Sequence, residues 1–459
     1  MNKTKGYSMF IFLFALRLQQ FIGAKTLFVS LVLICTLVNA QEEFLSKEEA
    51  VKLTLENNLG IKIAENNKEI AKNNKSALNT GYLPTLTATG SGSLDINDQE
   101  ATFQDGSVRE VDGAETKRYS AALNLGYTLF DGLGRWYNLK RLKEEYNLSD
   151  LQARQTIENS IIQLFTVYFE VARITENVGV LTETKANTQD RLKRAEYSFE
   201  YGQVNKLEVL NAQVDLVNDS INLMNEKQLL ANTLRDLNIV VNQDMERTFN
   251  VDTTVTFVSP LDLETYVKEA EVNNIRLLLA NSNISISDYN LKASRSVYLP
   301  TVGLTGSYGW NEGNFPATNF LASNTSTGVS AGINLTWNLF DGGSGITNNK
   351  NAKLALENQE VQKEQVLLEV KRDIANAKGD YENRLKVYRL QEQNVITATN
   401  NFDRSSERYK LGQITSVELR QAQINLLNAQ TSKNLAKYNA KLAELQLLQL
   451  TGQLLNIQY

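Results

Sequence analysis

The chain contains no histidine, one cysteine and four prolines among 459 residues. Without histidine, imidazole metal ligands and the most common general acid and base in enzymes are excluded. A single cysteine excludes a disulfide framework. The formal net charge is −5, which excludes a strongly basic, nucleic-acid-binding chain. These absences disfavour an enzyme and predict neither a bound metal nor a cofactor.

Long apolar runs are absent after residue 40, so no transmembrane helix is predicted in the mature chain. At the N-terminus, Lys25 precedes an apolar run from Leu27 to Val38, and residues 38–40 form a small-x-small cleavage pattern. We therefore predict that residues 1–40 are an export signal. A membrane anchor is the alternative, but about a dozen apolar residues are too few to span a bilayer as a helix.

The rest of the chain contains the same plan twice. Residues 123–134 are similar to residues 333–344, which begin 210 positions later. The tetrapeptide Tyr-Leu-Pro-Thr occurs at residues 82–85 and again at residues 298–301. Internal repeats of this kind define structural units. We predict a first repeat at 41–242, a linker at 243–262 and a second repeat at 263–459.

Each repeat is predicted to contain a helix, a β-hairpin and a long helical hairpin. The β-hairpins are placed at 85–130 and 301–340, with polar loops at about 97–117 and 312–325. After each loop, apolar and polar residues alternate over about eleven positions, the pattern of a barrel strand between lipid and water. The alternative is a soluble β-sandwich, which four strands in so long a chain fit poorly.

The alternation assigns one face of the strands to lipid. Leu335 is expected in the middle of its strand, with Asn334 on the opposite, lumenal face. The residues predicted to face lipid are Leu123, Leu125, Tyr127, Ile333, Leu335 and Trp337. Aromatic residues expected near strand ends, where an interfacial girdle lies, are Tyr127, Phe130, Trp310, Trp337 and Phe340.

The segments 131–199 and 341–409 contain no proline and carry apolar residues at heptad-like spacing. They are predicted to form helices roughly 100 Å long, which require lateral packing along their length. One apolar stripe of the returning arm comprises Leu207, Leu210, Val214, Val217, Ile221 and Met224. The repeated Asp131-Gly and Asp341-Gly pairs precede these helices, so turn formation or helix capping is favoured over catalysis.

Four strands cannot close a barrel, because closure around a filled interior takes about eight strands. An open sheet would leave unpaired backbone groups in hydrocarbon. The predicted fold class is therefore a mixed α and β membrane protein. Three copies would form a 12-stranded transmembrane β-barrel, continuous with a long periplasmic α-helical coiled-coil barrel.

The paired Tyr-Leu-Pro-Thr and Leu-Phe-Asp-Gly motifs, in matched order across residues 41–459, resemble those of TolC-like outer-membrane efflux proteins. The resemblance implies a homotrimer in the outer membrane of a Gram-negative bacterium, with a periplasmic helical extension. It also implies a passive export duct that docks with a periplasmic adaptor (membrane fusion) protein and an inner-membrane efflux or ABC-type transporter. Drugs, toxic small molecules or secreted proteins would pass outward.

Residues 199–208 and 409–418 are similar to each other and lie where each helical hairpin turns. Gly202 and Gly412 suit the left-handed conformation that ends a helix. The resemblance assigns an adaptor-docking tip to Gly202, Gln203, Val204, Gly412, Gln413 and Ile414.

The resemblance also assigns a periplasmic gate. Tyr409 matches the gate tyrosine and Glu208 its acidic hydrogen-bond partner, while Glu418 matches the first of two acidic positions around the pore. The sequence departs from the family at Gln421, which occupies the second acidic position. It also departs at Ile414, where some members carry a linking arginine.

Two other classes remain open at this stage. A periplasmic coiled-coil scaffold or adaptor would share the long hairpins but would lack paired lipid-facing strands. A hydrolase would need a nucleophile beside a base, and no spacing in the chain singles out such a pair.

Overall fold

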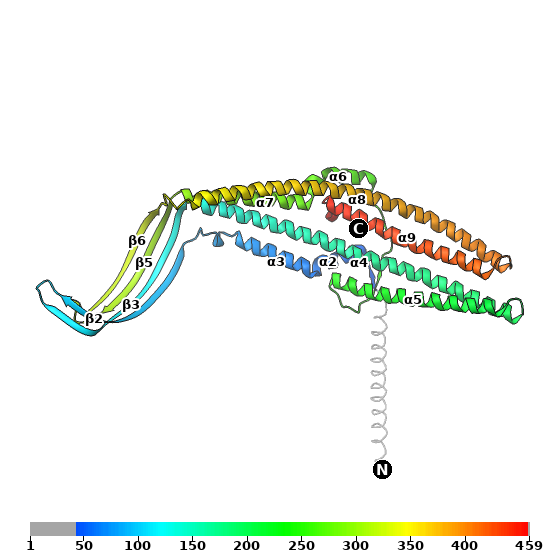
Figure 1. Ribbon diagram of the computed structural model, residues 1–459, viewed down its shortest axis with the longest axis horizontal. Helices are drawn as coiled ribbons and strands as arrows, with labels where there is room; N and C mark the ends of the chain where they lie inside the picture. The colour runs from blue at the N-terminus through cyan, green and yellow to red at the C-terminus, as the bar shows by residue number, and fades with distance from the viewer. Residues whose placement is uncertain (1–42, 458–459) are drawn as a thin grey trace, which may run out of the picture.

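The computed structural model describes residues 43–457, so the predicted export signal lies outside the described range. A β-sheet forms one end of the elongated molecule. Two long helices run from the sheet to the other end, and two shorter helices return from that end to the middle (Figure 1). Short helices and strands surround the middle. No helix within residues 43–457 is long and apolar enough to cross a membrane.

The sheet has four antiparallel strands in the order β2-β3-β5-β6. Its strands are β2 (Thr85–Thr102), β3 (Val108–Asp131), β5 (Thr301–Asn314) and β6 (Ser323–Thr336). The two sequence repeats therefore contribute one hairpin each, and the hairpins pair with each other through β3 and β5. Strands β2 and β6 are the edges, each paired on one side only within the described residues.

The strand register places the alternating apolar residues on a common face. Leu123 pairs with Ala88 on β2 and with Tyr308 on β5, and Tyr308 pairs with Val329 on β6. Two residues along, Leu125 lies in a row with Leu86 on one side. Because strand side chains alternate between faces, the polar residues between them share the other face. Leu123, Tyr308 and Val329 are exposed in the single chain.

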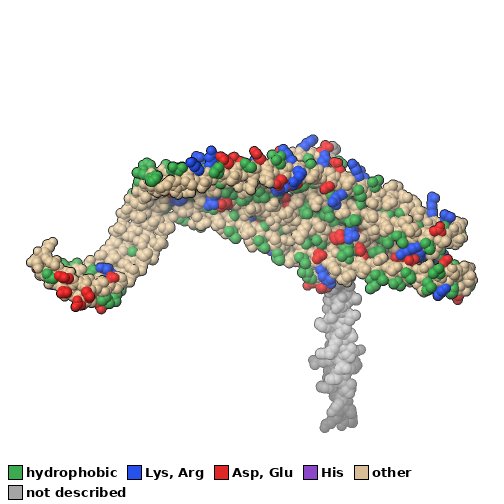
Figure 2. Space-filling model, in the orientation of Figure 1, with side chains coloured by type: hydrophobic (Ala, Val, Ile, Leu, Met, Phe, Trp, Pro, Cys, Tyr) green, Lys and Arg blue, Asp and Glu red, His purple; other side chains and the backbone are tan. Residues whose placement is uncertain are grey.

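The predicted loops at 97–117 and 312–325 are too long. Strand β2 continues to Thr102 and β3 begins at Val108, while β5 continues to Asn314 and β6 begins at Ser323. The hydrogen-bonded ladder extends beyond the apolar alternation, because strand pairing in water does not require apolar residues. The extended β2–β3 hairpin carries a group of acidic side chains at the far end of the sheet (Figure 2).

The placement of Leu335 in the middle of its strand is also wrong. Strand β6 ends at Thr336, so Leu335 is its penultimate residue and pairs with Val302 near the helical end of the sheet. Residues 337–340, the end of the predicted second hairpin, lie beyond the strand. There the Trp337 indole N–H donates to the backbone carbonyl of Tyr298 at 3.2 Å instead of joining the ladder.

Two helical hairpins form the other end of the molecule. They consist of α4 (Gly134–Glu200) with α5 (Lys206–Val241), and of α8 (Ser344–Lys410) with α9 (Ser416–Leu450). Helices α4 and α8 each contain 67 residues, which corresponds to about 100 Å. The capping expected of the Asp-Gly pairs is confirmed. Asp131 accepts a hydrogen bond from the backbone N–H of Arg135, and Asp341 from that of Gly345.

Shorter elements complete each repeat beside the long helices (Figure 1). The helices are α2 (Lys47–Asn57), α3 (Leu59–Asn74), α6 (Pro260–Asn273) and α7 (Ile275–Ser294). The 3-10 turns are η2 (Ala77–Asn79), η3 (Arg295–Tyr298) and η4 (Leu454–Asn456). Helix α3 lies along α4, and α7 lies between α4 and α8, so these shorter helices continue the helical layer up to the sheet.

The main core lies in the middle of the molecule, where α4, α5, α8 and α9 meet the short elements. Strand β1 (Glu43–Leu45) pairs in parallel with β4 (Phe249–Val251), which joins the beginning of the described chain to the segment between the repeats. The buried Tyr168 hydroxyl donates to the carbonyl of Leu45 and accepts from the N–H of Asp252. Burial raises the pKa of this hydroxyl, which stays neutral and holds the junction.

The apolar residues of the two helices of the first hairpin have different environments. Residues such as Ile161, Leu164 and Tyr168 of α4 are buried in the core. The stripe of α5, from Leu207 to Met224, is exposed along its length. A single chain therefore leaves an apolar helical face uncovered.

Candidate functional site

The candidate site lies at the ends of the two helical hairpins, farthest from the sheet. At the first turn Gly202 has φ of +69°, and at the second Gly412 has φ of +70°. The N–H of Gln203 donates to the carbonyl of Ser198, and that of Gln413 donates to the carbonyl of Arg408. These are the hydrogen bonds of a helix that ends in a left-handed residue. The two repeats thus build the same turn twice, as the glycines predicted.

The two turns border one open cavity of about 700 Å³. Three of the four predicted gate residues, Glu208, Tyr409 and Glu418, line it. The predicted tip residues that also line it are Gln203, Val204, Gly412, Gln413 and Ile414. Residues from the two halves of the chain, about 200 positions apart in sequence, therefore meet at this end of the molecule.

The fourth predicted gate residue, Gln421, lies one turn further along α9 and does not line the cavity. Its side chain is exposed, and its amide donates to Asn425 on the same helix at 2.9 Å. Within the described residues the Gln421 side chain therefore makes no hydrogen bond to another helix.

Glu418 has a local structural role in addition to its predicted role in the pore. Its carboxylate accepts hydrogen bonds from the backbone N–H and the hydroxyl of Thr415, and the Glu418 N–H donates back to that hydroxyl. This is a complete capping box at the start of α9. The backbone and side-chain hydrogen bonds from Thr415 lower the pKa of Glu418, which therefore stays ionised at lower pH than an ordinary glutamate.

Glu208 occupies the same position at the start of α5, but its box is incomplete. The Asn205 side chain accepts from the Glu208 N–H, whereas no hydrogen bond reaches the Glu208 carboxylate within residues 43–457. The half-buried carboxylate is thus available to another partner. The described residues show no hydrogen bond between Glu208 and Tyr409, although both border the cavity, so that contact stays a prediction.

A buried charged cluster lies directly behind the cavity, and sequence reasoning did not find it. Arg420 of α9 donates to both carboxylate oxygens of Asp219 on α5, at 2.7 and 2.8 Å. Arg191 of α4 pairs with Asp215 on α5 at 2.5 Å and donates to the backbone carbonyl of Ser416 at the start of α9. We call these four side chains, together with Thr188 and Gln423, the interhelix cluster. It ties α9 to the first hairpin.

Neutral side chains complete the interhelix cluster. The Thr188 hydroxyl lies 2.7 Å from Asp219, and the Gln423 amide donates to Thr188 and to the carbonyl of Thr184. Asp219 is 1% exposed. Burial alone would lower the pKa of Arg420, but the hydrogen bond and charge of Asp219 raise it. Arg420 thus remains charged.

The interhelix cluster left no signal in the sequence, because its members come from positions about 190, 215 and 420. Charged residues occur on the polar faces of all four long helices. Only the packing of three helices shows which of these charges are buried.

The comparisons with known proteins agree with this arrangement. The family described as outer membrane efflux protein matches residues 50–243 and 266–453. The outer membrane protein TolC of Vibrio cholerae serotype O1 is 25% identical over 392 residues, which cover 84% of this chain and 85% of that protein. The outer membrane efflux protein BepC of Brucella suis biovar 1 is 20% identical over 395 residues, covering 86% and 81%.

Among solved structures, the Campylobacter jejuni CmeC outer membrane channel is similar with a TM-score of 0.72 at 19% identity, covering 89% of this chain and 86% of that chain. CusC, described as forming a transmembrane channel, is similar with a TM-score of 0.72 at 15% identity, covering 90% and 94%. At these identities the likeness shows a common fold.

Proposed function

Because the chain belongs to the outer membrane efflux protein family, we propose that three copies of it form one duct that docks with a periplasmic adaptor and an inner-membrane transporter. The protein is an outer-membrane efflux channel with a periplasmic helical extension. The observation that carries the trimer proposal is the exposed four-stranded sheet, which has two open edges. Unpaired edges are not tolerated in hydrocarbon, so they must pair with further copies.

The exposed helical stripes support the same assembly. The α5 stripe from Leu207 to Met224 is uncovered in one chain, and α8 exposes Leu354, Val361 and Leu368 at intervals of seven residues. A heptad interval is typical of helices that pack along their length against other helices. We propose that neighbouring copies cover these stripes, so that the sheet and the helices close into barrels together.

Aromatic residues support the lipid-facing assignment. Phe130 pairs with Val302 near the helical end of the sheet, and Trp310 lies eight residues further along β5. At about 3.3 Å per residue, the two levels are roughly 26 Å apart along the strand. This is close to the height of the apolar band of an outer-membrane barrel, about 25 Å. The aromatic girdle therefore stays our proposal, with Leu123, Leu125 and Ile333 between its two levels.

Assembly can be tested directly. The full-length protein is expected in the outer-membrane fraction as a trimer that survives mild detergent, because three copies pair all open sheet edges. Light scattering after size-exclusion chromatography, corrected for bound detergent, gives the number of chains. A monomer in the soluble periplasmic fraction would contradict the barrel and favour the scaffold alternative.

We further propose that the two turns at Gly202 and Gly412 form the adaptor-docking tip, and that Glu208, Tyr409, Glu418 and Gln421 form the gate. The cavity shared by both turns supports this assignment, because it gathers Glu208, Tyr409 and Glu418 at one end of the helices. In a trimer, three copies of Glu418 would converge on the axis.

A cation-block experiment tests the gate. A multivalent cation added from the periplasmic side is expected to reduce single-channel current, because a narrow mouth lined by like charges concentrates counterions. Glu418→Gln should abolish most of the block while preserving the capping box, since glutamine also serves at that position. Gln421→Asp should strengthen the block by adding a second ring. Planar-bilayer recordings over a cation series provide the measurement.

The pH dependence of this block has a defined sign. The lowered pKa of Glu418 means that its charge is present at neutral pH and is lost only when the pH falls below the range of an ordinary glutamate. Block should therefore persist in mild acid and vanish in stronger acid. An unchanged block in Glu418→Gln would remove Glu418 from the proposed gate.

A further inference from the structure

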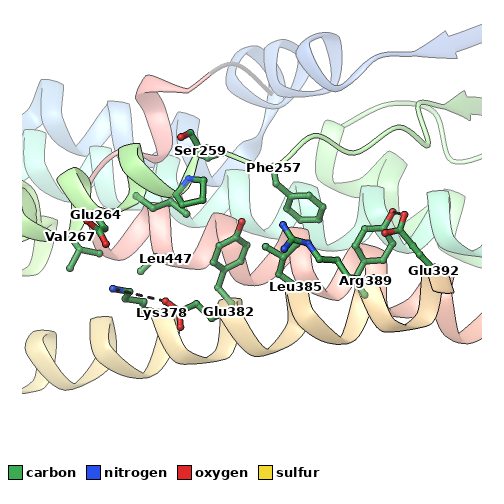
Figure 3. A pocket seen from close by; sticks show the side chains of 15 residues that line it. Phe257, Ser259, Glu264, Val267, Lys378, Glu382, Leu385, Arg389, Glu392 and Leu447 are labelled. Atoms are coloured by element: carbon green, nitrogen blue, oxygen red, sulfur yellow. Dashed lines mark hydrogen bonds and ion pairs between the residues drawn. The ribbon is translucent and has the colours of Figure 1, made fainter. Parts of the chain in front are cut away.

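A second cavity lies in the middle of the molecule, far from the candidate gate. Its volume is about 370 Å³, and its lining comes from the segment before α6, from α6, and from α8 and α9 (Figure 3). Small-molecule sites in proteins are typically apolar clefts of about 300–1,000 Å³ with a few placed polar groups. This cavity has that size, and its walls come from the segment between the repeats and from three helices of the second repeat.

The floor of the cavity is fixed by buried hydrogen bonds. The Tyr381 hydroxyl donates to the Glu444 carboxylate at 3.1 Å, and the N–H of Val258 donates to the same oxygen at 2.9 Å. The other oxygen of Glu444 pairs with Lys441, whose ammonium also donates to the carbonyl of Thr256. Tyr381 and Glu444 are both buried. The segment before α6 is therefore held on α8 and α9, and the cavity is preformed.

Three aromatic rings form one half of the cavity. The Phe257 ring lies 6.4 Å from that of Tyr381 and 6.0 Å from that of Tyr388, both in tilted arrangements. Leu385 and Leu447 lie beside these rings. Aromatic walls at these angles favour a flat apolar group through offset or edge contacts.

Some charged side chains at the rim of the cavity have a hydrogen-bond or ion-pair partner among the described residues, and one does not. Glu392 accepts a hydrogen bond from the Tyr388 hydroxyl at 2.7 Å, and Glu382 lies 4.0 Å from the Lys378 ammonium. Within residues 43–457, the exposed Arg389 guanidinium makes no hydrogen bond or ion pair, and it extends toward Phe257 at the aromatic half (Figure 3). Glu264 lies at the opposite end beside Val267.

We propose that this cavity binds a small amphipathic anion with a flat aromatic body. The body lies among Phe257, Tyr381 and Leu385, and a carboxylate or sulfonate faces Arg389. A guanidinium is suited to such groups because it presents parallel N–H donors. Glu264 at the other end disfavours a second negative charge, so the ligand carries one. The cavity is too small for a helix, which disfavours a polypeptide occupant.

The test uses the full chain in its assembled form, reconstituted in lipid nanodiscs. Three probes of the same shape are titrated by saturation-transfer NMR: 2-naphthoate, neutral 2-naphthalenemethanol and cationic 2-naphthylmethylammonium. Naphthoate should bind most tightly. Arg389→Gln should weaken the affinity for naphthoate by about fivefold, the scale of an exposed ion pair. It should leave the affinity for the neutral probe unchanged. Leu385→Trp should fill the cavity and remove binding of all three.

Arg384→Gln is the matched control, because it removes the same charge from an exposed position on α8 that does not line the cavity. It should leave every affinity unchanged. The proposal is wrong if naphthoate does not bind, which is the result expected if a neighbouring copy covers the cavity. It is also wrong if Arg389→Gln and Arg384→Gln act alike, or if the neutral probe binds as tightly. The readout is binding alone, so it stands independently of channel conductance.

Discussion

Asp219→Ala is expected to open the periplasmic end of the channel. The substitution leaves the mostly buried Arg420 without its main partner and removes one of the acceptors of the Thr188 hydroxyl. Loss of one partner from a buried ion pair typically costs about 3–5 kcal/mol. Because this pair joins α9 to α5, its loss should destabilise the packing of α9 against α5 near the tip. Single-channel recordings should show longer or larger openings, and the first turns of α9 should exchange amide hydrogens faster.

A double substitution separates the pair from its surroundings. Replacing both partners, as Arg420→Met with Asp219→Leu, removes the buried charges together, and such replacements are often neutral or stabilising. The double variant should therefore keep the closed current, whereas either single substitution should raise the open fraction. Additive effects of the two single substitutions would show that the pair does not hold the helices together.

Asp190→Asn serves as the control for charge removal. Asp190 lies beside Arg191 on α4. Among the described residues its one ion pair is with Lys193, at 3.9 Å, and this pair is exposed to solvent. Exposed pairs of this kind contribute about 0–1 kcal/mol. Asp190→Asn should leave openings and exchange unchanged. If Asp190→Asn had the same effect as Asp219→Ala, the cause would be the change in net charge and not the loss of the interhelix cluster.

The interhelix cluster is not fully satisfied, which bears on gating. Within residues 43–457, the buried Nε atoms of Arg191 and Arg420 have no hydrogen-bond partner. An unpaired buried donor typically costs about 1–3 kcal/mol. The closed contact is therefore weaker than a fully paired one, and a duct that must open benefits from a contact of intermediate strength.

The sequence was informative where local chemistry decides structure. Alternation around Leu123 and Ile333 predicted four strands, and the register confirms that the alternating residues share one face. The repeated Asp131 and Asp341 predicted turns or helix caps, and both side chains accept a hydrogen bond from an N–H in the first turn of the following helix. Gly202 and Gly412 predicted the two turns. Each of these features depends on residues within a few positions of one another.

The sequence did not predict contacts between distant segments. It also did not predict strands whose side chains lie in water, because such strands need no apolar alternation. The extended β2–β3 hairpin carries no apolar alternation, since its side chains need not face lipid. Arg420 and Asp219 are ordinary helix-surface residues until three helices pack around them. Glu208 and Glu418 also occupy equivalent positions in the sequence, although only the Glu418 carboxylate takes part in a capping box among the described residues. Their difference depends on whether the residue before the helix is asparagine or threonine, and on side-chain direction.

The strand ends determine where a buried charge should cost most in the barrel. The two aromatic levels lie at the pairs Val302–Leu335 and Trp310–Thr327, and Ala331 lies midway between them on the same face as Leu335. Ala331→Arg should therefore destabilise each copy by about 2–4 kcal/mol, as expected at the bilayer midplane. Leu335→Arg, near the interface, should cost only about 0–1 kcal/mol. The sequence had placed Leu335 in the middle of its strand, where an arginine would lower the free energy of unfolding more.

The neighbouring residues supply the controls for this depth dependence. Ser330 and Asn334 lie on the opposite face, which we assign to the lumen, so Ser330→Arg and Asn334→Arg should both be tolerated. Denaturant titration of trimers in lipid vesicles measures each free energy of unfolding. If Ser330→Arg were as harmful as Ala331→Arg, the two faces would be wrongly assigned. Ala331 and Leu335 lie on one face and differ only in their depth in the bilayer. If Leu335→Arg lowered the free energy of unfolding as much as Ala331→Arg, the apolar band would extend past the aromatic level toward the helical end.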